Sequence, residues 1–255
     1  MLNSSEVLIA LQQALNTTQL YMVYQPIYDL HSHSISGFEA LMRWNSPQLG
    51  MISPDVFITL LEASGNIFSI EDMVPSPPWN IAATWPEPLT LSLNISALEF
   101  CDPRLPQRIS NNLAACELPA HRCQIEVTET SPLCDSQVAA KNMHELKALG
   151  MKLALDDFGT GHANLNYLLK YPFDTLKIDK EFVAAIGPDA KSTKIIEGII
   201  SLAHNFGIEV LAEGVETRSQ LERLTHIGCD KIQGFFISPP VMAEEIPSLL
   251  TQYNP

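Results

Sequence analysis

Acidic and amide side chains stand at the ends of several short apolar runs in this sequence. The plainest case is LALDDF, in which Asp156 and Asp157 directly follow three apolar residues. The residues placed in this way are Glu39, Asn94, Glu126, Asp156, Asp157, Glu213 and Gln233, and one cation, Lys177, has the same kind of position. If the runs are strands whose ends meet, their oxygen atoms form a cluster of the hard donors that Mg²⁺ and Mn²⁺ prefer. The pattern therefore predicts a metal site.

The charge of this cluster also requires bound cations. Its five carboxylates are opposed by one lysine, Lys177. Two like charges about 4 Å apart repel by roughly 4 kcal/mol at an effective dielectric constant of about 20, so most of the carboxylates would otherwise have to stay protonated. No Cys or His belongs to the set, which disfavours zinc. One aspartate of the Asp156–Asp157 pair can bridge two cations while its neighbour binds the second.

Each of these residues also has an ordinary structural interpretation. A carboxylate at the end of a strand can cap the next helix, and adjacent aspartates can form a turn. Asn94 can be a turn former, and Lys177 can be one partner of a structural ion pair. These interpretations would have to hold together at every strand end, and we therefore favour the metal site.

Eight apolar runs alternate with helical patterns along the chain. The runs are 21–30, 35–44, 89–96, 123–129, 152–158, 175–179, 209–214 and 231–236. Helical spacing is clearest in 136–150, with Val138, Ala139, Met143, Leu146 and Leu149, and in 192–207, with Ile195, Ile196, Ile199, Ile200, Ala203 and Phe206. Gly150 and Gly207 suit the ends of these helices. Eight strands with intervening helices predict an α/β fold of the (β/α)₈ barrel type, in which strand ends converge on one face.

The link between the first two runs departs from a regular barrel. Only HSHSI, residues 31–35, joins them. This is a hairpin length, too short for the crossover between parallel strands. We therefore predict that the first strand runs antiparallel to its neighbour, within a single domain formed by residues 1–255. The prolines of residues 72–88 predict a broken helix or an irregular excursion there.

Composition disfavours several classes of protein. The chain of 255 residues carries a formal net charge of −14, so binding to a nucleic-acid polymer through a basic surface is not expected. No apolar run approaches the roughly 18 to 20 residues of a membrane span, and no Lys or Arg precedes Arg43, so neither direct membrane insertion nor a signal peptide is expected. The five cysteines lack metal-binding spacing and are expected to be reduced thiols in the cytoplasm.

Taken together, the motifs resemble those of the EAL family, the cyclic-di-GMP phosphodiesterases. Glu39-Ala40-Leu41 matches the motif that gives the family its name. Further motifs follow in the family's order as LNIS (93–96), EVTE (126–129), DDFGTG (156–161), LKID (176–179), AEGVE (212–216) and QGFF (233–236). The resemblance extends from about Leu11 to Pro240. It implies a modified TIM barrel with an antiparallel first strand, and hydrolysis of cyclic di-GMP to linear pGpG by two Mg²⁺ or Mn²⁺ ions per active site.

The resemblance also implies a role for each motif residue. One metal ion would be held by Glu39, Asn94, Glu126 and Asp156, and the second by Asp156, Asp157 and Glu213. Lys177 would hold or deprotonate the attacking water, with Glu213 as the alternative general base. Substrate contacts would come from Gln25, Arg43 and Asp179, and supporting contacts from Gln233, which also faces the substrate, and Glu216. Glu129 would anchor the DDFGTG loop beside the interface of a homodimer. Any sensory domains would lie outside this chain.

Two features depart from the family's pattern. His162-Ala163 replaces the usual Tyr-Ser pair after DDFGTG, and the region between Glu62 and Asn94 is shorter and richer in proline. Two alternatives to a phosphodiesterase follow from other uses of the barrel. A receptor that binds cyclic di-GMP without hydrolysing it would be expected to have gaps in its acidic set. A lyase or aldolase using Lys177 as a Schiff base would not need five carboxylates around that lysine.

Overall fold

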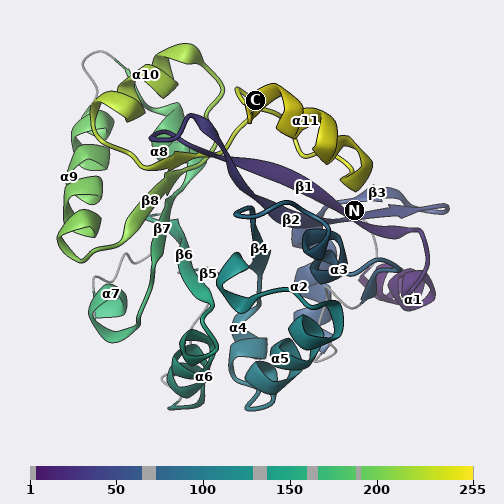
Figure 1. The fold of residues 1–255 in the computed structure, drawn as a ribbon. Coiled ribbons are helices and arrows are strands. Elements are labelled where there is room, and N and C mark those ends of the chain that lie inside the picture. The colour runs from purple at the N-terminus through teal and green to yellow at the C-terminus, as the bar shows by residue number, and fades with distance from the viewer. Residues whose placement is uncertain (1–3, 65–72, 129–136, 160–165, 188–190, 255) are drawn as a thin grey trace.

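The protein is a barrel of strands surrounded by helices, as seen in a computed structural model that describes residues 4–64, 73–128, 137–159, 166–187 and 191–254 (Figure 1). The strands are β1 (Leu20–Asp29), β2 (Ser34–Ser46), β3 (Gly50–Ile52), β4 (Thr90–Asn94), β5 (Cys123–Thr128), β6 (Lys152–Phe158), β7 (Thr175–Ile178), β8 (Glu209–Ala212) and β9 (Lys231–Ile232). They pair in the order β1-β9-β8-β7-β6-β5-β4-β2, and β1 also pairs with β2. These strands therefore close into a mixed barrel, as the sequence predicts.

Helices follow most of the strands and lie outside the barrel (Figure 1). They are α1 (Ser4–Ala14), α2 (Pro54–Ser64), α3 (Pro78–Ala83), α4 (Ala97–Phe100), α5 (Leu105–Cys116), α6 (Gln137–Ala148), α7 (Asn166–Lys170), α8 (Lys180–Ala184), α9 (Lys191–Asn205), α10 (Arg218–His226) and α11 (Ile246–Tyr253), with two 3₁₀ turns, η2 (Ala120–Arg122) and η3 (Ala243–Glu245). Among the described residues, no helix combines the length and apolar character needed to cross a membrane.

The first strand is antiparallel to both of its neighbours. β1 pairs with β2 in a register that places Gln25 opposite Glu39, and it pairs antiparallel with β9 on its other side. The connection from β1 to β2 is a tight turn in which His33 adopts a positive φ of 54°. The remaining neighbours in the ring, from β2 and β4 round to β8 and β9, are parallel. The prediction from the short link is confirmed, whereas the short strand β3, antiparallel to β2, was not predicted.

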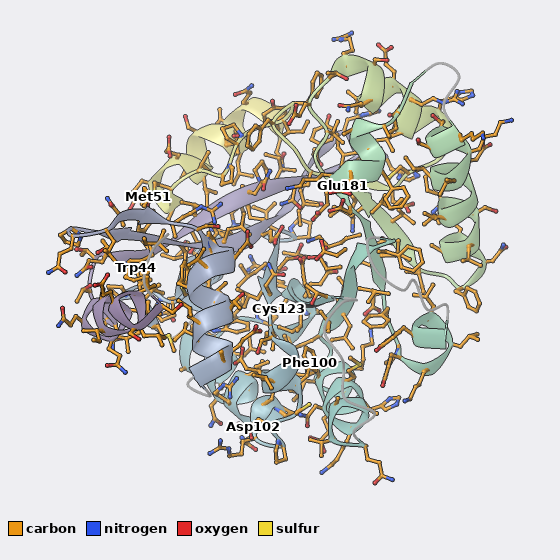
Figure 2. The ribbon with its side chains drawn as sticks, turned by 180° about the vertical axis from the view of Figure 1, so that it is seen from behind. Trp44, Met51, Phe100, Asp102, Cys123 and Glu181 are labelled. Carbon is orange, nitrogen blue, oxygen red and sulfur yellow. The ribbon has the colours of Figure 1, made fainter. Side chains whose placement is uncertain are left out.

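Apolar side chains fill the space between the strands and the helices (Figure 2). Trp44 and Phe100, both labelled there, are fully buried. Helix α9 buries Thr193, Ile196, Ile199, Ile200 and Ala203, and α6 buries Ala139, Asn142, Met143 and Leu146. The helices predicted from this spacing are present, and three of the spaced apolar residues, Ile195, Phe206 and Leu149, are 50%, 48% and 40% exposed. An apolar side chain one position away from the buried face of a helix points away from the barrel and into solvent.

Residues 73–88 form an irregular excursion, as predicted for the described part of the proline-rich segment. It contains only the short helix α3, which starts at Pro78, where proline's missing N–H has no consequence. The buried guanidinium of Arg122 holds the end of the excursion, since it donates to the carbonyl oxygens of Ala82, Trp85 and Leu89 at 3.1, 3.2 and 2.9 Å. Asp72 lies outside the described residues.

Candidate metal centre and active site

The carboxyl ends of the parallel strands bring the predicted site residues together. Asn94 of β4 pairs in register with Glu126 of β5, and Thr128 of β5 pairs with Asp156 of β6. Glu39 of β2 lies beside Ser92, two residues before Asn94. Because side chains alternate along a strand, residues two apart point to the same side. Positions distant in sequence therefore share one rim of the barrel interior.

Lys177 lies at the centre of this cluster. Its Nζ atom lies 2.5 Å from Glu126 Oε2, 2.7 Å from Glu213 Oε1, 3.1 Å from Asp156 Oδ2 and 3.5 Å from Glu39 Oε2. Lys177 is 1% exposed. Burial alone would lower the pKa of the ammonium group, but the surrounding carboxylates outweigh it and raise the pKa well above its usual value. Lys177 is therefore a protonated, buried counter-ion for the acidic set.

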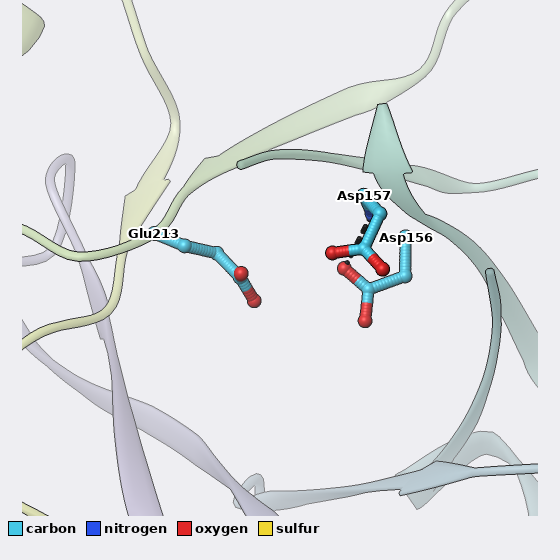
Figure 3. Close-up of side chains that lie close together, drawn as sticks. All are labelled: Asp156, Asp157 and Glu213. Atoms are coloured by element: carbon cyan, nitrogen blue, oxygen red, sulfur yellow. Dashed lines mark hydrogen bonds between the residues drawn. The ribbon is translucent and has the colours of Figure 1, made fainter. Parts of the chain in front are cut away.

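Asp156, Asp157 and Glu213 form a second group of converging oxygen atoms. One carboxylate oxygen from each lies within 4.8 Å of the others, and Figure 3 shows the three side chains pointing into a common space. The backbone N–H of Asp157 donates to Asp156 Oδ1 at 2.8 Å. Asp157 has a positive φ of 56°, and the pairing of β6 with β7 shifts register at this point. The left-handed residue turns two successive side chains toward the same space, which a regular strand would not do.

Amide side chains orient Glu39 from two sides. Asn94 Nδ2 donates to Glu39 Oε1 at 2.7 Å, and Gln233 Nε2 donates to Glu39 Oε2 at 2.7 Å. Two buried oxygen atoms at this site, Glu126 Oε1 and Gln233 Oε1, have no hydrogen-bond partner. Buried polar atoms are normally satisfied, so these two oxygens are suited to contact a bound cation or ligand group. The donor set, which consists of carboxylate and amide oxygens, fits Mg²⁺ or Mn²⁺.

The metal-free site holds its carboxylates in an unfavourable environment. Burial raises the pKa of Glu126 to about 8, and the charges of Glu39 and Asp156 add to this effect. Burial and then Asp156 likewise raise the pKa of Glu213, also to about 8. The pKa of Asp157 rises to about 6, mainly through burial and the adjacent Asp156 charge. In each case Lys177 opposes the rise without cancelling it.

A cavity of about 580 Å³ opens above the acidic cluster, and we call it the rim cavity. It is lined by Gln25, Glu39, Leu41, Arg43, Asn94, Thr128, Asp156, Asp157, Lys180, Glu213, Gly214, Glu216, Gln233, Gly234, Phe235 and Pro240. Sequence reasoning singled out most of the polar members but missed Lys180, Leu41, Phe235 and Pro240. Lys180 directly follows the LKID motif, and Phe235 stands two residues after Gln233, so their positions carried a usable signal.

Asp179, Glu216 and Glu129 stand apart from the cluster in different ways. Asp179 is buried and caps helix α8, where its Oδ1 accepts from the backbone N–H of Glu181 at 2.7 Å, and it is absent from the lining of the rim cavity. Glu216 lines that cavity, and its backbone N–H donates to Gln220 Oε1 at 2.9 Å. Glu129 lies outside the described residues, as does His162 in the loop that departs from the family's pattern.

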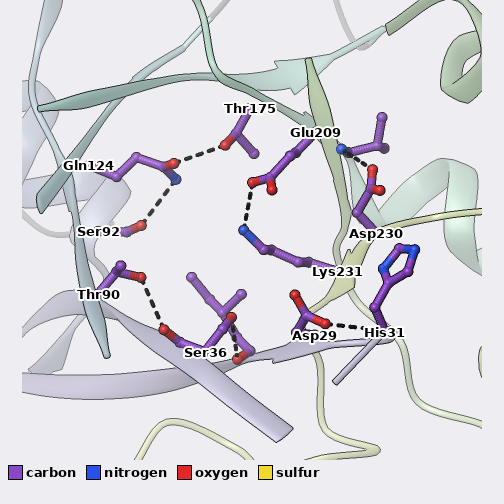
Figure 4. Close-up of polar contacts among 12 residues, drawn as sticks. Asp29, His31, Ser36, Thr90, Ser92, Gln124, Thr175, Glu209, Asp230 and Lys231 are labelled. Carbon is purple, nitrogen blue, oxygen red and sulfur yellow. Dashed lines mark hydrogen bonds and ion pairs between the residues drawn. The ribbon is translucent and has the colours of Figure 1, made fainter. Parts of the chain in front are cut away.

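A polar layer lies below the acidic cluster, toward the opposite end of the barrel (Figure 4). Ser92, Gln124 and Thr175 each stand two residues before a site residue on the same strand. Gln124 Nε2 donates to Ser92 Oγ at 3.2 Å, and Thr175 Oγ1 donates to Gln124 Oε1 at 2.9 Å. This chain joins β5 to β4 and β7, so it ties together strands that carry Asn94, Glu126 and Lys177.

The chain is similar in sequence and in fold to known proteins. A family model described as "EAL domain" matches residues 9–240. The protein named bifunctional diguanylate cyclase/cyclic di-GMP phosphodiesterase MucR, from Pseudomonas aeruginosa, is 34% identical over 245 residues, which cover 94% of this chain and 36% of MucR. A solved complex of the PaMucR phosphodiesterase with c-di-GMP superposes with a TM-score of 0.85 at 33% identity, covering 94% of this chain and 99% of that one.

A second solved structure, the EAL enzyme Bd1971 bound to cAMP and cyclic-di-GMP, has a TM-score of 0.88 at 31% identity. That likeness covers 97% of this chain and 68% of Bd1971. The chain spans about a third of the length of the curated relatives it matches.

Proposed function

This chain belongs to the EAL domain family, and from that premise we propose that it is a metal-dependent phosphodiesterase that hydrolyses cyclic di-GMP, a bacterial second messenger, to linear pGpG. The observation that carries the proposal is the complete acidic set around Lys177, of which Glu39, Asp156 and Glu213 line the rim cavity. A Schiff-base enzyme would need an unprotonated lysine, whereas the four carboxylates here keep Lys177 protonated.

The residues present fit two divalent cations. Glu39, Asn94, Glu126 and Asp156 would hold one, and Asp156, Asp157 and Glu213 the other. When bound, such cations supply Lewis-acid activation of water and stabilise negative charge on the leaving oxygen. The chain's part is to align its carboxylates, and Gln233 does this for Glu39.

Lys177 and Glu213 divide the handling of the attacking water between them. As a buried ammonium group, Lys177 is suited to donate a hydrogen bond and orient the water oxygen. Glu213, whose carboxylate lies beside this ammonium group, is the candidate to accept the water's proton. Their ion pair of 2.7 Å places donor and acceptor side by side.

The rim cavity offers matching groups for a cyclic dinucleotide. Arg43 and Lys180 supply positive charge to the phosphates, and a guanidinium group fits a phosphate through two donors. Gln25 and the free Oε1 of Gln233 add polar contacts. Phe235 is 64% exposed on the cavity wall, where its ring can stack with a base. Asp179, which does not line the cavity, would act indirectly by capping helix α8.

Several further features follow from the same proposal. Residues 1–255 form one phosphodiesterase domain, which acts as a homodimer, and any sensory domains lie elsewhere in a longer protein. The protein acts in the cytoplasm, where thiols such as those of Cys116, Cys123 and Cys229 stay reduced.

The deciding experiment is incubation of the purified protein with cyclic di-GMP and Mg²⁺ or Mn²⁺, followed by chromatography of the products. We expect pGpG with either ion and none with a chelator. A Glu39→Ala variant, which loses the contacts of both Asn94 and Gln233, should give none in any condition. Calorimetric binding of cyclic di-GMP without any pGpG would favour the receptor instead.

A further inference from the structure

A second cavity of about 580 Å³ lies on the outer face of β1, and we call it the outer cavity. Its wall includes Leu20, Met22 and Tyr24 of β1, Ile81 of α3, and Ala243 and Glu244 of η3. The proline-rich residues Val74, Pro75 and Ser76 complete the wall. Its volume is within the range of small-molecule sites in proteins. The irregular excursion therefore has a structural consequence, since it forms one side of this cavity.

The Tyr24 hydroxyl group is the polar feature that singles out this cavity. Tyr24 is 1% exposed, and its ring packs edge-on against Trp85 with centroids 5.7 Å apart. Among the described residues, the hydroxyl has no hydrogen-bond partner, and Tyr24 is part of the cavity wall. A hydroxyl group that has no protein partner and belongs to a cavity wall is available to hydrogen-bond a molecule in the cavity. Burial, and then the charge of Glu244, raise the pKa of Tyr24 well above its usual value.

The charge of the wall restricts the kind of molecule that fits. Of the described residues that line the cavity, Glu244 alone carries a formal charge, and the whole chain carries −14. An ammonium group can pair with Glu244 and donate to the Tyr24 oxygen, and a tyrosine ring adds a cation–π attraction. The leucine, methionine and isoleucine side chains favour an apolar body for the rest of the molecule.

The outer cavity and the rim cavity share two wall segments. Gln25 faces the rim cavity, whereas its neighbour Tyr24 faces the outer cavity. In the second segment, Pro240 lines the rim cavity and Met242 lines the outer cavity. Tyr24 and Val241 exchange two backbone hydrogen bonds, of 2.7 and 2.9 Å, so the two segments move as one. A molecule that shifts Tyr24 would also shift Gln25.

We propose that the outer cavity binds a small apolar amine and that its occupancy changes the affinity of the rim cavity for its substrate. The binding site stands on its own, whereas the coupling rests on the proposed phosphodiesterase function. The two parts can fail separately, because binding of an amine is measured without cyclic di-GMP.

The binding experiment uses 2-(1-naphthyl)ethylamine as a fluorescent probe of the full chain. We expect saturable binding of one molecule, abolished by Ala243→Trp and by Ser76→Trp, which fill the cavity from opposite walls. Ser219→Trp, on the exposed surface of α10, is the matched control and should bind as the native protein does. Tyr24→Phe should weaken binding about three- to tenfold, which corresponds to one hydrogen bond. The anionic analogue 1-naphthaleneacetate should bind more weakly than the amine.

Two results would overturn the site, namely no saturable binding or binding that both Trp substitutions leave unchanged. An unchanged affinity in Tyr24→Phe would exclude the role of the hydroxyl.

For the coupling, saturating probe should change KM for cyclic di-GMP at least twofold in the native protein and not in Ala243→Trp. The same KM with and without probe, in a protein that binds the probe, would overturn the coupling alone. A native protein that binds the probe but forms no pGpG would instead contradict the proposed function.

Discussion

Lys177 Nζ lies 2.7 Å from Glu213 Oε1, and this ion pair joins the carboxyl ends of the neighbouring strands β7 and β8. The same ammonium group also contacts carboxylates from β2, β5 and β6. One buried cation thus holds the acidic rim together when no metal is bound. It also places a fixed hydrogen-bond donor beside a carboxylate, which is an arrangement suited to orienting a water molecule and accepting its proton.

The division of roles between Lys177 and Glu213 can be tested by substitution. Lys177→Met and Glu213→Gln should each lower kcat by about 10²- to 10⁴-fold, the usual contribution of a proton-transfer group. They should differ in the pH dependence of kcat/KM. If Glu213 is the general base, kcat/KM rises with pH as Glu213 loses its proton. Glu213→Gln should therefore lose this rise. Lys177→Met should keep the rise, with a lower kcat/KM at every pH.

Lys231→Met is the matched control, because Lys231 pairs with Glu209 at the opposite end of the barrel (Figure 4). Its kcat should stay within about twofold of the native value, because Lys231 does not line the rim cavity and its ion pair is with Glu209, which is not a site residue. A pH profile that keeps its rise in Glu213→Gln and loses it in Lys177→Met would assign the base to the lysine instead.

The backbone at Asp157 leads to a second prediction. At φ 56° an alanine costs roughly 1–2 kcal/mol in strain, whereas asparagine tolerates this conformation as aspartate does. Both Asp157→Ala and Asp157→Asn should abolish turnover, because each removes a candidate metal ligand. In chelator, however, urea unfolding should find Asp157→Asn more stable than Asp157→Ala by about 1 kcal/mol. Equal stabilities would show that the conformation imposes no cost, and substantial Mg²⁺-dependent activity in either variant would remove Asp157 from the metal site.

The sequence predicts the barrel, and the convergence of the candidate site residues on one rim, because both depend on short-range patterns. A buried strand ending in a carboxylate is visible in LALDDF, and the period of two along a strand places Glu126 and Lys177 inside the same barrel. The five-residue link HSHSI likewise forces a hairpin, whatever the rest of the chain does. These features require no knowledge of distant contacts.

What the sequence does not reveal depends on contacts between distant segments. Arg122 gives no sign in the sequence that its partners are the carbonyl oxygens of Ala82, Trp85 and Leu89. Asp179 reads as a strand-end carboxylate like the others, but a local hydrogen bond to the next turn makes it a helix cap. The exposure of Ile195 depends on how far α9 is rotated about its axis, which packing decides.

The raised pKa values predict how stability depends on pH. In the folded, metal-free protein Glu126 and Glu213 hold their protons up to about pH 8, whereas in the unfolded chain they lose them near pH 4.3. The folded state therefore binds more protons between these limits, and the free energy of unfolding should fall as pH rises through that window. Bound Mg²⁺ requires deprotonated carboxylates, so added Mg²⁺ should reduce or reverse this fall.

Thermal unfolding between about pH 5 and 8 checks this, with chelator and with excess Mg²⁺. The informative quantity is the difference between the native protein and Glu126→Gln, which cannot ionise at that position. In chelator the native protein should lose more stability with rising pH than Glu126→Gln does. Parallel curves for the two proteins would contradict a raised pKa at Glu126. Calorimetry in buffers of different ionisation enthalpy should also show protons released when Mg²⁺ binds.

Arg122 leads to a prediction about stability rather than chemistry. Its guanidinium group is buried and donates to three backbone carbonyl oxygens at the end of the proline-rich excursion. Arg122→Met keeps the apolar stem but leaves these oxygens without that donor, which should lower the free energy of unfolding by about 3 kcal/mol. Arg218→Met removes an arginine that is 81% exposed and should change it by less than about 0.5 kcal/mol. Urea unfolding of both variants provides the comparison, and equal effects would show that Arg122 does not hold the excursion in place.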